Sequence, residues 1–217
     1  MATQLNLEEQ EQIDQIKHFW HRWGNLITWF LILVLAAYSG WNGWQWWERR
    51  NASQAAVLYD AVDQAVRQAD MTLLDRSLND IQSRYASAAI TQHASLLAAR
   101  VYESKGATDK AQAALRAVVA QASDEGLVAL ASLRLAALQM QAQDWAAAKA
   151  TLERKVPATL QALFDEAMGD WSALQGQNES AQAAYLKAWK AHAAGSDGRR
   201  WLEIKLAPMG VQPQEKS

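Results

Sequence analysis

The apolar positions of the chain follow one pattern up to about residue 50 and another pattern beyond it. The 25 residues from Trp23 to Trp47 carry no charge, and Leu26–Ser39 is the most apolar stretch among them. After Arg50, apolar residues recur three and four positions apart, the spacing that places them on one face of a helix. We find no convincing alternation of apolar and polar residues that would indicate a strand. The pattern predicts an all-α protein in which one apolar helix precedes a series of amphipathic helices.

The apolar stretch has the features of a transmembrane helix. A helix needs roughly 20 apolar residues to cross about 30 Å of hydrocarbon. The apolar centre is shorter than this, but tryptophans extend it at both ends: Trp20, Trp23, Trp41, Trp44, Trp46 and Trp47. Indole rings favour the boundary between lipid and water, where the N–H group stays hydrated. We therefore expect residues 23–47 to span a membrane, behind a short acidic leader at residues 1–22.

A cleaved signal peptide is the alternative, because Ala37-Tyr38-Ser39 matches a small-x-small cleavage site. A signal peptide begins with basic residues, whereas this leader has two cations and four acids: Glu8, Glu9, Glu11 and Asp14. The acidic leader and the tryptophans beyond the site favour an anchor. The sequence leaves the orientation of the anchor open, because each flank carries two cations and the positive-inside rule then gives no answer.

Small residues in the apolar stretch form two small-x-x-x-small pairs, Ala36 with Gly40 and Ser39 with Gly43. Small side chains let the backbones of two membrane helices approach closely. These four residues are therefore candidates for packing against another membrane helix, although small residues are common in such helices without that role.

A repeat emerges when the predicted helix pairs are aligned. Each copy has a turn residue, a small residue five positions later and a large residue nine positions later: Gly106, Ala111 and Leu115; Gln143, Ala148 and Leu152; Gly176, Ala181 and Tyr185. The copies are offset by 37 and 33 residues, and a small residue lies seven positions before each turn: Ala99, Ala136 and Gly169. Over residues 92–190 this resembles the tetratricopeptide repeat, a helix–turn–helix of about 34 residues. An irregular helical bundle is the alternative.

The repeats have helical neighbours on both sides. Amphipathic segments near 52–69 and 71–85 are expected to form a first, atypical pair, and a helix near Arg199–Leu206 is expected to cap the last repeat. We therefore predict a helical-repeat soluble domain at residues 48–208, followed by a flexible tail at residues 209–217.

The chain lacks the residues that common catalytic sites require. It has no cysteine, no glycine-rich phosphate loop and no G-x-S-x-G motif. His18 and His21 lie one helical turn apart, but two histidines without a third ligand make a poor metal site. The net charge of −2 and the lack of a basic run argue against nucleic acid as a partner. We predict a protein-binding module that is not an enzyme and uses no cofactor or metal.

A stack of helical repeats offers a concave surface lined by the first helix of each pair. Counted from the repeat anchors, the inward positions are His93, Leu96, Arg100 and Glu103; Leu130, Leu133, Ala137 and Met140; and Leu163, Glu166, Asp170 and Ala173. This predicts a groove with an apolar middle and charged ends, suited to an extended or helical segment of a partner. For any single leucine, burial in the core is the competing interpretation.

The whole layout resembles the YfgM-like ancillary subunits of the bacterial SecYEG translocon, over nearly the full chain. The matching segments are 15–20 at the end of the leader, 43–47 at the end of the anchor, 54–59 in the first soluble helix, and 123–127 followed by 133–136. In the last of these, Ser123 or Asp124 is placed to cap the helix that carries the leucines. The tail beyond about Arg200 is less similar to the family.

The resemblance implies a single-pass protein of the inner membrane of a Gram-negative bacterium, with the N-terminus in the cytoplasm and the helical domain in the periplasm. It implies association with the SecYEG translocon and with a membrane-anchored periplasmic chaperone (PpiD-like). The role would be to assist chaperone handling of translocated proteins, with translocating polypeptides as further partners and membrane lipid around the anchor. The alternative is an envelope scaffold that joins membrane protein complexes without contacting translocating chains.

Overall fold

The computed structural model describes residues 7–213, and it describes the side chains of Lys17 and of residues 20–213. In this part of the chain every regular element is a helix, as the sequence predicts. The chain divides into two units, Met1–Asn51 and Ala52–Ser217, and the long helix α1 (Leu7–Gln68) contributes to both. The side chains of the four leader acids and of His18 lie outside the described part.

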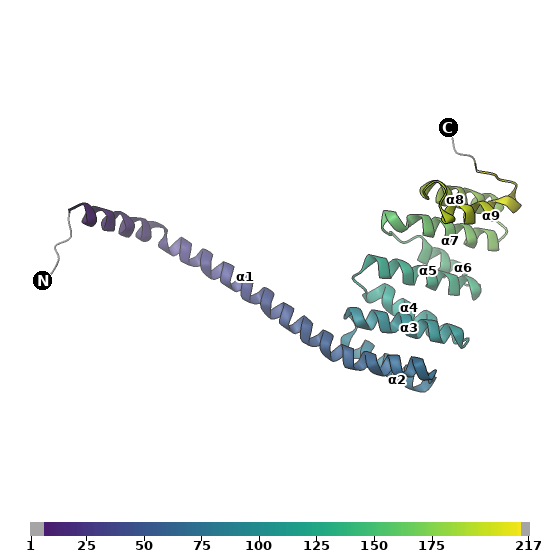
Figure 1. The fold of residues 1–217 in the computed structure, drawn as a ribbon, viewed down its shortest axis with the longest axis horizontal. Coiled ribbons are helices and arrows are strands. Elements are labelled where there is room, and N and C mark those ends of the chain that lie inside the picture. The colour runs from purple at the N-terminus through teal and green to yellow at the C-terminus, as the bar shows by residue number, and fades with distance from the viewer. Residues whose placement is uncertain (1–6, 214–217) are drawn as a thin grey trace. The chain divides into compact units, whose positions relative to one another are not determined.

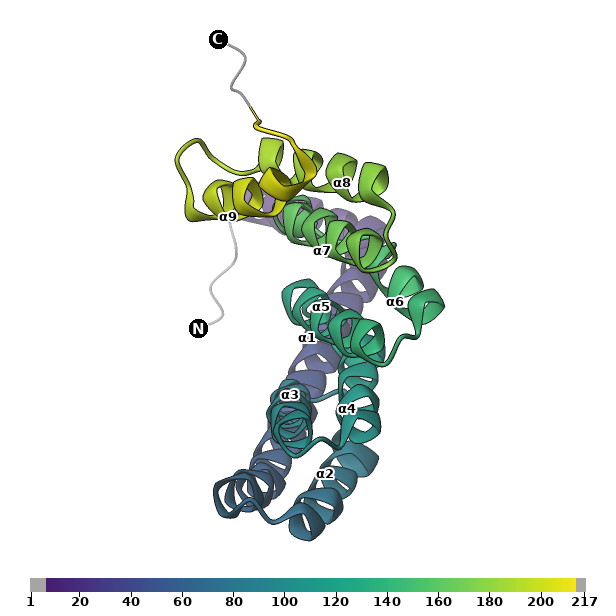
Figure 2. The same ribbon diagram turned by 90° about the vertical axis from the view of Figure 1, so that its right-hand side faces the viewer.

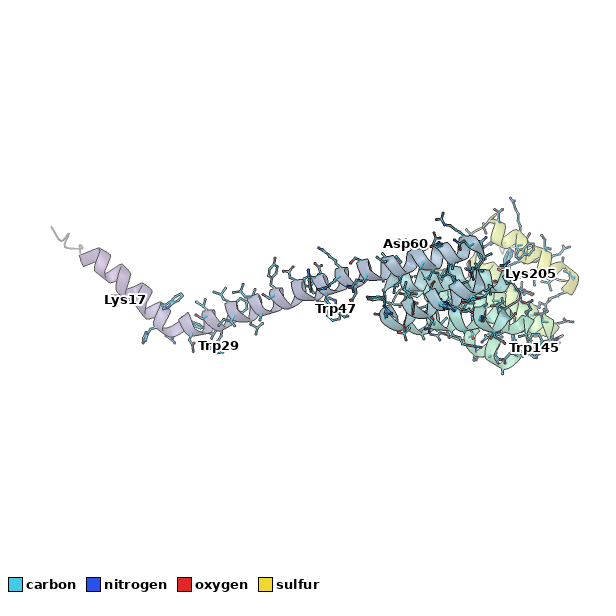
Figure 3. The ribbon with its side chains drawn as sticks, turned by 90° about the horizontal axis from the view of Figure 1, so that it is seen from below. Lys17, Trp29, Trp47, Asp60, Trp145 and Lys205 are labelled. Atoms are coloured by element: carbon cyan, nitrogen blue, oxygen red, sulfur yellow. The ribbon has the colours of Figure 1, made fainter. Side chains whose placement is uncertain are left out.

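In the first unit, α1 is helical throughout the predicted anchor. Its large apolar side chains are exposed, Trp29 at 64% for example, and only 6% of its most apolar window is buried within the protein. Side chains project from all sides of the helix around Trp29 and Trp47 (Figure 3). A helix that is apolar all round and is not buried in protein needs another apolar environment. By length and composition it is suited to cross a membrane.

The second unit consists of the end of α1 and eight further helices, joined by short connections. These helices are α2 (Met71–Tyr85), α3 (Ala89–Ser104), α4 (Thr108–Gln121), α5 (Glu125–Gln141), α6 (Trp145–Leu152), α7 (Gln161–Leu174), α8 (Asn178–Ala191) and α9 (Asp197–Leu206). Two 3₁₀ turns, η1 (Ala158–Leu160) and η2 (Ala207–Met209), precede α7 and follow α9. The helices follow one another along a stack (Figure 1). Helices α3, α5 and α7 form one column of this stack, and α2, α4, α6 and α8 form the other (Figure 2).

The predicted repeat positions are the places where the helices of each pair touch. The small and large anchors that follow each turn are all buried, with Ala111, Ala148 and Ala181 at 0% exposure. The small residues before each turn, such as Ala136, are buried as well. A Cβ added to Gly169 would overlap the ring of Tyr185, so only glycine permits this approach of α7 to α8. Close approach of paired helices therefore explains the small residues of the pattern.

The turn residues share one backbone conformation. Gly106, Gln143 and Gly176 have φ values of 72°, 60° and 71°, in the left-handed region. At each turn the next residue donates its backbone N–H to a carbonyl near the end of the preceding helix, which completes the C-terminal cap. Ala69, between α1 and α2, also has a positive φ of 50°. The first pair is thus a further copy of the same unit, with the turn residue 37 positions before Gly106.

The second unit is held by three clusters of buried side chains along the stack. The largest joins the end of α1 to α2, α3, α4 and α5; the second lies between α5, α6 and α7; and the third lies between α8 and α9. Met209 and Val211, which the sequence analysis assigned to the tail, pack against the third cluster. Asp124 caps α5 by accepting the backbone N–H of Leu127 at 2.9 Å.

Candidate partner-binding surface

Helices α3, α5 and α7, which form one column of the stack, each carry a strip of exposed or half-exposed residues. The strips step by four and then three residues, which keeps them on one side of each helix. Their central residues are His93, Leu97 and Arg100 on α3; Leu130, Arg134 and Ala137 on α5; and Leu163, Ala167 and Asp170 on α7. We call these nine residues the first-helix face, because each helix is the first of its pair. Asp60 of α1 and Trp145 of α6, a second helix, lie on opposite sides of the stack (Figure 3).

The structure places several predicted groove residues on this face and moves others off it. His93, Arg100 and Leu130 are exposed, as the groove prediction requires. Leu96 belongs to the core, at 9% exposure, and its neighbour Leu97 occupies the more open position. In the same way Leu133 packs against a core cluster while Arg134 is exposed. On α3 and α5 the exposed residue at the centre of the strip is therefore one position later than predicted, because Leu96 and Leu133 pack in or against buried clusters.

The remaining predicted residues lie at the edges of the face. Glu103 is exposed and Met140 is half-buried, and each lies beside a strip and not within it. Glu166 and Asp170, predicted as an open acidic end of the groove, are instead bound by one lysine. The Nζ atom of Lys205 on α9 donates to Glu166 Oε1 at 2.8 Å and to Asp170 Oδ1 at 2.6 Å. One of the two negative charges at this end is therefore balanced by a cation of the same chain.

The contact between α7, α8 and α9 is a network of three charged groups and a phenol. Tyr185 Oη donates to Asp170 Oδ1 at 2.7 Å, and Lys205 Nζ lies 5.4 Å from the centre of the Tyr185 ring. Burial alone lowers the pKa of Lys205, but its hydrogen bonds with Asp170 and Glu166 outweigh burial and hold the pKa above its usual value. Burial and the hydrogen bond to Asp170 raise the pKa of Tyr185 above its usual range. Lys205 is thus held as a cation, and Tyr185 as a neutral donor.

The same arrangement occurs near the other end of the stack. Tyr102 on α3 donates to Asp75 Oδ1 on α2 at 2.7 Å, and Lys110 on α4 donates to Asp75 Oδ2 at 2.6 Å. The hydrogen bonds from Lys110 and Tyr102 hold the pKa of Asp75 below its usual value, against the opposing effect of burial. In both cases the acid, the tyrosine and the lysine come from three consecutive helices. We call these two groups the Tyr–Asp–Lys clamps.

A cleft of about 920 Å³ opens at the edge of the stack, between the α4–α5 connection, the segment that joins α6 to α7, and α8. Helix α6 has only eight residues, and its connection to α7 includes Pro157, which lines the cleft. Its lining mixes Val128 and Val156 with the ion pair of Asp165 and Lys187, whose atoms lie 2.8 Å apart. Glu125 and Lys155 add one charge of each sign to the lining, so the cleft has no excess of either sign.

The predicted packing residues of the anchor lie on open surface. Ala36, Ser39, Gly40 and Gly43 are exposed, and no other part of the described chain lies within 4 Å of a Cβ added to either glycine. The spacing of three and four positions places all four on one side of α1. The chain itself therefore leaves room at this side for another helix.

Within the described residues, no group of three or more His, Cys, Asp or Glu side chains is placed to hold a metal ion. The structure has two prominent exposed surfaces. One is an apolar helix that no other part of the protein covers, and the other is the first-helix face, with its exposed leucines and arginines. These features define a helical-repeat protein that carries, in the described part of the chain, one helix suited to span a membrane.

Comparison with known proteins agrees with this class. The family described as "Tetratricopeptide repeat-like domain" matches residues 17–211. An "Ancillary SecYEG translocon subunit" of Neisseria gonorrhoeae is 31% identical over 205 residues, which cover 93% of this chain and 97% of the relative. A protein of the same name from Haemophilus influenzae is 27% identical over 209 residues, which cover 94% of this chain and 96% of the relative. No solved structure shows a significant match. The chain belongs to the tetratricopeptide repeat-like family, and to the family of these ancillary translocon subunits.

Proposed function

We propose that this chain is an inner-membrane protein that associates with the SecYEG translocon and binds other proteins through its helical-repeat domain. The observation that carries the proposal is the length of the match. The similarity to the Neisseria subunit covers 93% of this chain, so both the apolar helix and the repeat domain have counterparts in a protein named for the translocon. A chain that shared only the repeat domain would not support association with a membrane channel.

The two units are suited to different contacts, one within the membrane and one outside it. The apolar helix, with its open small-residue side at Gly40 and Gly43, is suited to meet another membrane helix. The repeat domain presents the first-helix face to a soluble segment. A membrane tether raises the effective concentration of the domain beside its partner, so a weak interaction of this face is sufficient. Binding of this kind requires no nucleotide and no catalytic group.

A pull-down in mild detergent tests the translocon association. We expect the full-length protein to co-purify channel subunits, and we expect a chain without residues 1–50 to lose them. The variant Gly40→Leu with Gly43→Leu tests the small-residue side directly, with Ala37→Leu as a control on another side of the helix. Absence of channel subunits from the full-length sample would contradict the proposed association with the translocon.

A second proposal concerns the orientation of the chain in the membrane and a further protein partner. We propose that the N-terminus lies in the cytoplasm, that the repeat domain lies in the periplasm, and that a membrane-anchored periplasmic chaperone is a partner. The family resemblance supports this proposal. A reporter enzyme that is active only in the periplasm, fused after Ser217, should be active. A fusion that works only with a cytoplasmic reporter would contradict the orientation.

Photo-crosslinking separates translocation from scaffolding. A photoreactive residue at Leu130 or Leu163, both on the first-helix face, should capture the segment that occupies it. Lys190, exposed on α8, is a matched control outside the face. Capture of newly exported chains or of a chaperone from the face alone supports a role in translocation. Capture of resident membrane proteins alone would favour an envelope scaffold.

A further inference from the structure

We propose that the first-helix face binds a partner segment that is both acidic and apolar: an amphipathic helix that carries carboxylates beside its aliphatic side chains. The inference rests on the proposed function only in taking the repeat domain to bind proteins. It adds the chemistry of the partner, which follows from the side chains of the face.

The apolar half of the face consists of leucines on neighbouring first helices. Leu130 on α5 and Leu163 on α7 occupy equivalent positions, 33 residues apart, and each is 41% exposed. Leu97 on α3 is half-exposed beside them. The position equivalent to Leu130 on α3 is occupied by His93, and Leu97 lies one turn further along that helix. Together the three leucines present aliphatic surface that the stack does not cover. An aliphatic side chain of a partner would remove this surface from water.

The charged half of the face is basic, although the whole chain has a net charge of −2. Arg100 and Arg134 are exposed on adjacent first helices. Neither side chain takes part in any hydrogen bond or ion pair between described residues. Asp170, the acid on the face, is already bound by Lys205 and by Tyr185. Glu103, the exposed acid at the edge of α3, offsets part of this positive charge, and among the nine residues of the face two arginines stand against one aspartate.

These two halves select one kind of partner. A purely apolar segment would cover the arginine heads without giving them acceptors, which is costly for a charged group. A basic segment would meet Arg100 and Arg134 with like charge, which costs affinity at an interface. Carboxylates beside aliphatic side chains satisfy both halves, since a guanidinium group binds a carboxylate through paired hydrogen bonds. An amphipathic helix presents both kinds of side chain on neighbouring turns, as in other complexes in which a helix docks on a protein surface.

The test uses the full chain in nanodiscs of phosphatidylcholine, with empty nanodiscs as the blank. The probes are two fluorescent helical peptides with the same leucine spacing, one with glutamates and one with lysines on its flanks. The glutamate peptide should bind, and its affinity should fall as salt is raised. In the variant Arg100→Glu with Arg134→Glu we expect its affinity to fall by about tenfold or more. The lysine peptide should gain affinity for the same variant.

The matched control is Arg76→Glu with Arg84→Glu, which makes the same change of charge at two exposed positions of α2, a second helix. This control should retain the affinity of the unchanged protein for the glutamate peptide. Leu163→Ser tests the apolar half and should also weaken binding. Equal loss in the control, equal binding of both peptides, or no binding of either would overturn the inference. Peptide binding without channel subunits in the pull-down would overturn the translocon proposal and leave this inference standing.

Discussion

Replacing Lys205 by methionine tests whether α9 is held on the stack by charge. Methionine keeps an unbranched apolar stem that can pack on Tyr185, but it removes the ammonium group. The change leaves Glu166 and Asp170 one helical turn apart without a cation between them. It should weaken the docking of α9, while the helices before α7 keep their own contacts.

The expected cost follows from how deeply the three groups lie. Side-chain exposure is 19% for Lys205, 18% for Glu166 and 37% for Asp170, so the pairs are neither exposed nor fully buried. Breaking a fully buried pair costs about 3–5 kcal/mol, and an exposed pair contributes about 1 kcal/mol or less. A single hydrogen bond to a charged group contributes about 1.5–3 kcal/mol. We expect a loss of about 2–3 kcal/mol in the stability of α9 against local opening.

Amide hydrogen exchange reports this local opening directly, because helices of a repeat protein can open separately. Peptides that cover residues 197–206 should exchange about 30- to 150-fold faster in Lys205→Met than in the unchanged protein. Peptides of α3 should not change. The triple variant with Glu166→Gln and Asp170→Asn should recover most of the protection, because no unpaired charge remains. If Lys205→Met exchanges like the unchanged protein, or if the triple variant is no better than the single, the charge argument is wrong.

Four further outcomes follow from the packing, the backbone conformation and the pKa directions. Gly169→Ala should destabilise the chain by about 1–3 kcal/mol in urea unfolding, because its Cβ would overlap the buried Tyr185 ring; an unchanged midpoint would show that α7 and α8 can separate freely. Gln143→Gly should stabilise it by up to about 1 kcal/mol in the same assay, because glycine removes the strain of a positive φ. The pKa of Asp75 is lowered, so its contribution to stability is lost as pH falls below 3.8, and Asp75→Asn should flatten the acid limb of a plot of unfolding midpoint against pH. The pKa of Lys205 is raised, so its contribution is lost as pH rises above 10.5, and Lys205→Met should flatten the alkaline limb.

The sequence predicts the repeats well because their anchors are set by local geometry. Turns such as the one at Gly106 need a residue in the left-handed conformation, and helix contacts such as the one at Ala111 need a small side chain. Both requirements restrict the residue type at a fixed position, so they can be recognised in the sequence. The first helix pair, formed by the end of α1 and α2, does not align with the other repeats in sequence. Val62 and Leu74 occupy positions where the later copies have small residues. Its turn residue, Ala69, is also neither glycine nor polar.

The face is harder to predict than the repeats, because it depends on contacts between elements distant in sequence. Steps of three then four residues and of four then three fit the helical period equally well, so spacing alone does not decide between Leu96 and Leu97. Packing of the second helices decides it. The neutralisation of Asp170 comes from Lys205, which lies 35 residues away on a helix outside the aligned repeats. No local pattern marks that pair.

The clamp at Lys205 therefore links the stability of the stack to the charge of its binding face. While Lys205 is in place, Asp170 is paired with a cation, and Arg100 and Arg134 are the exposed charges of the face. Lys205→Met returns uncompensated carboxylates to the end of the face, so it should weaken binding of the glutamate peptide as well as loosen α9. The triple variant with Glu166→Gln and Asp170→Asn should restore that binding together with α9, because it removes the returned charge. If the peptide affinity stays low in the triple variant while α9 is again protected, Lys205 itself contacts the partner, and the face extends onto α9.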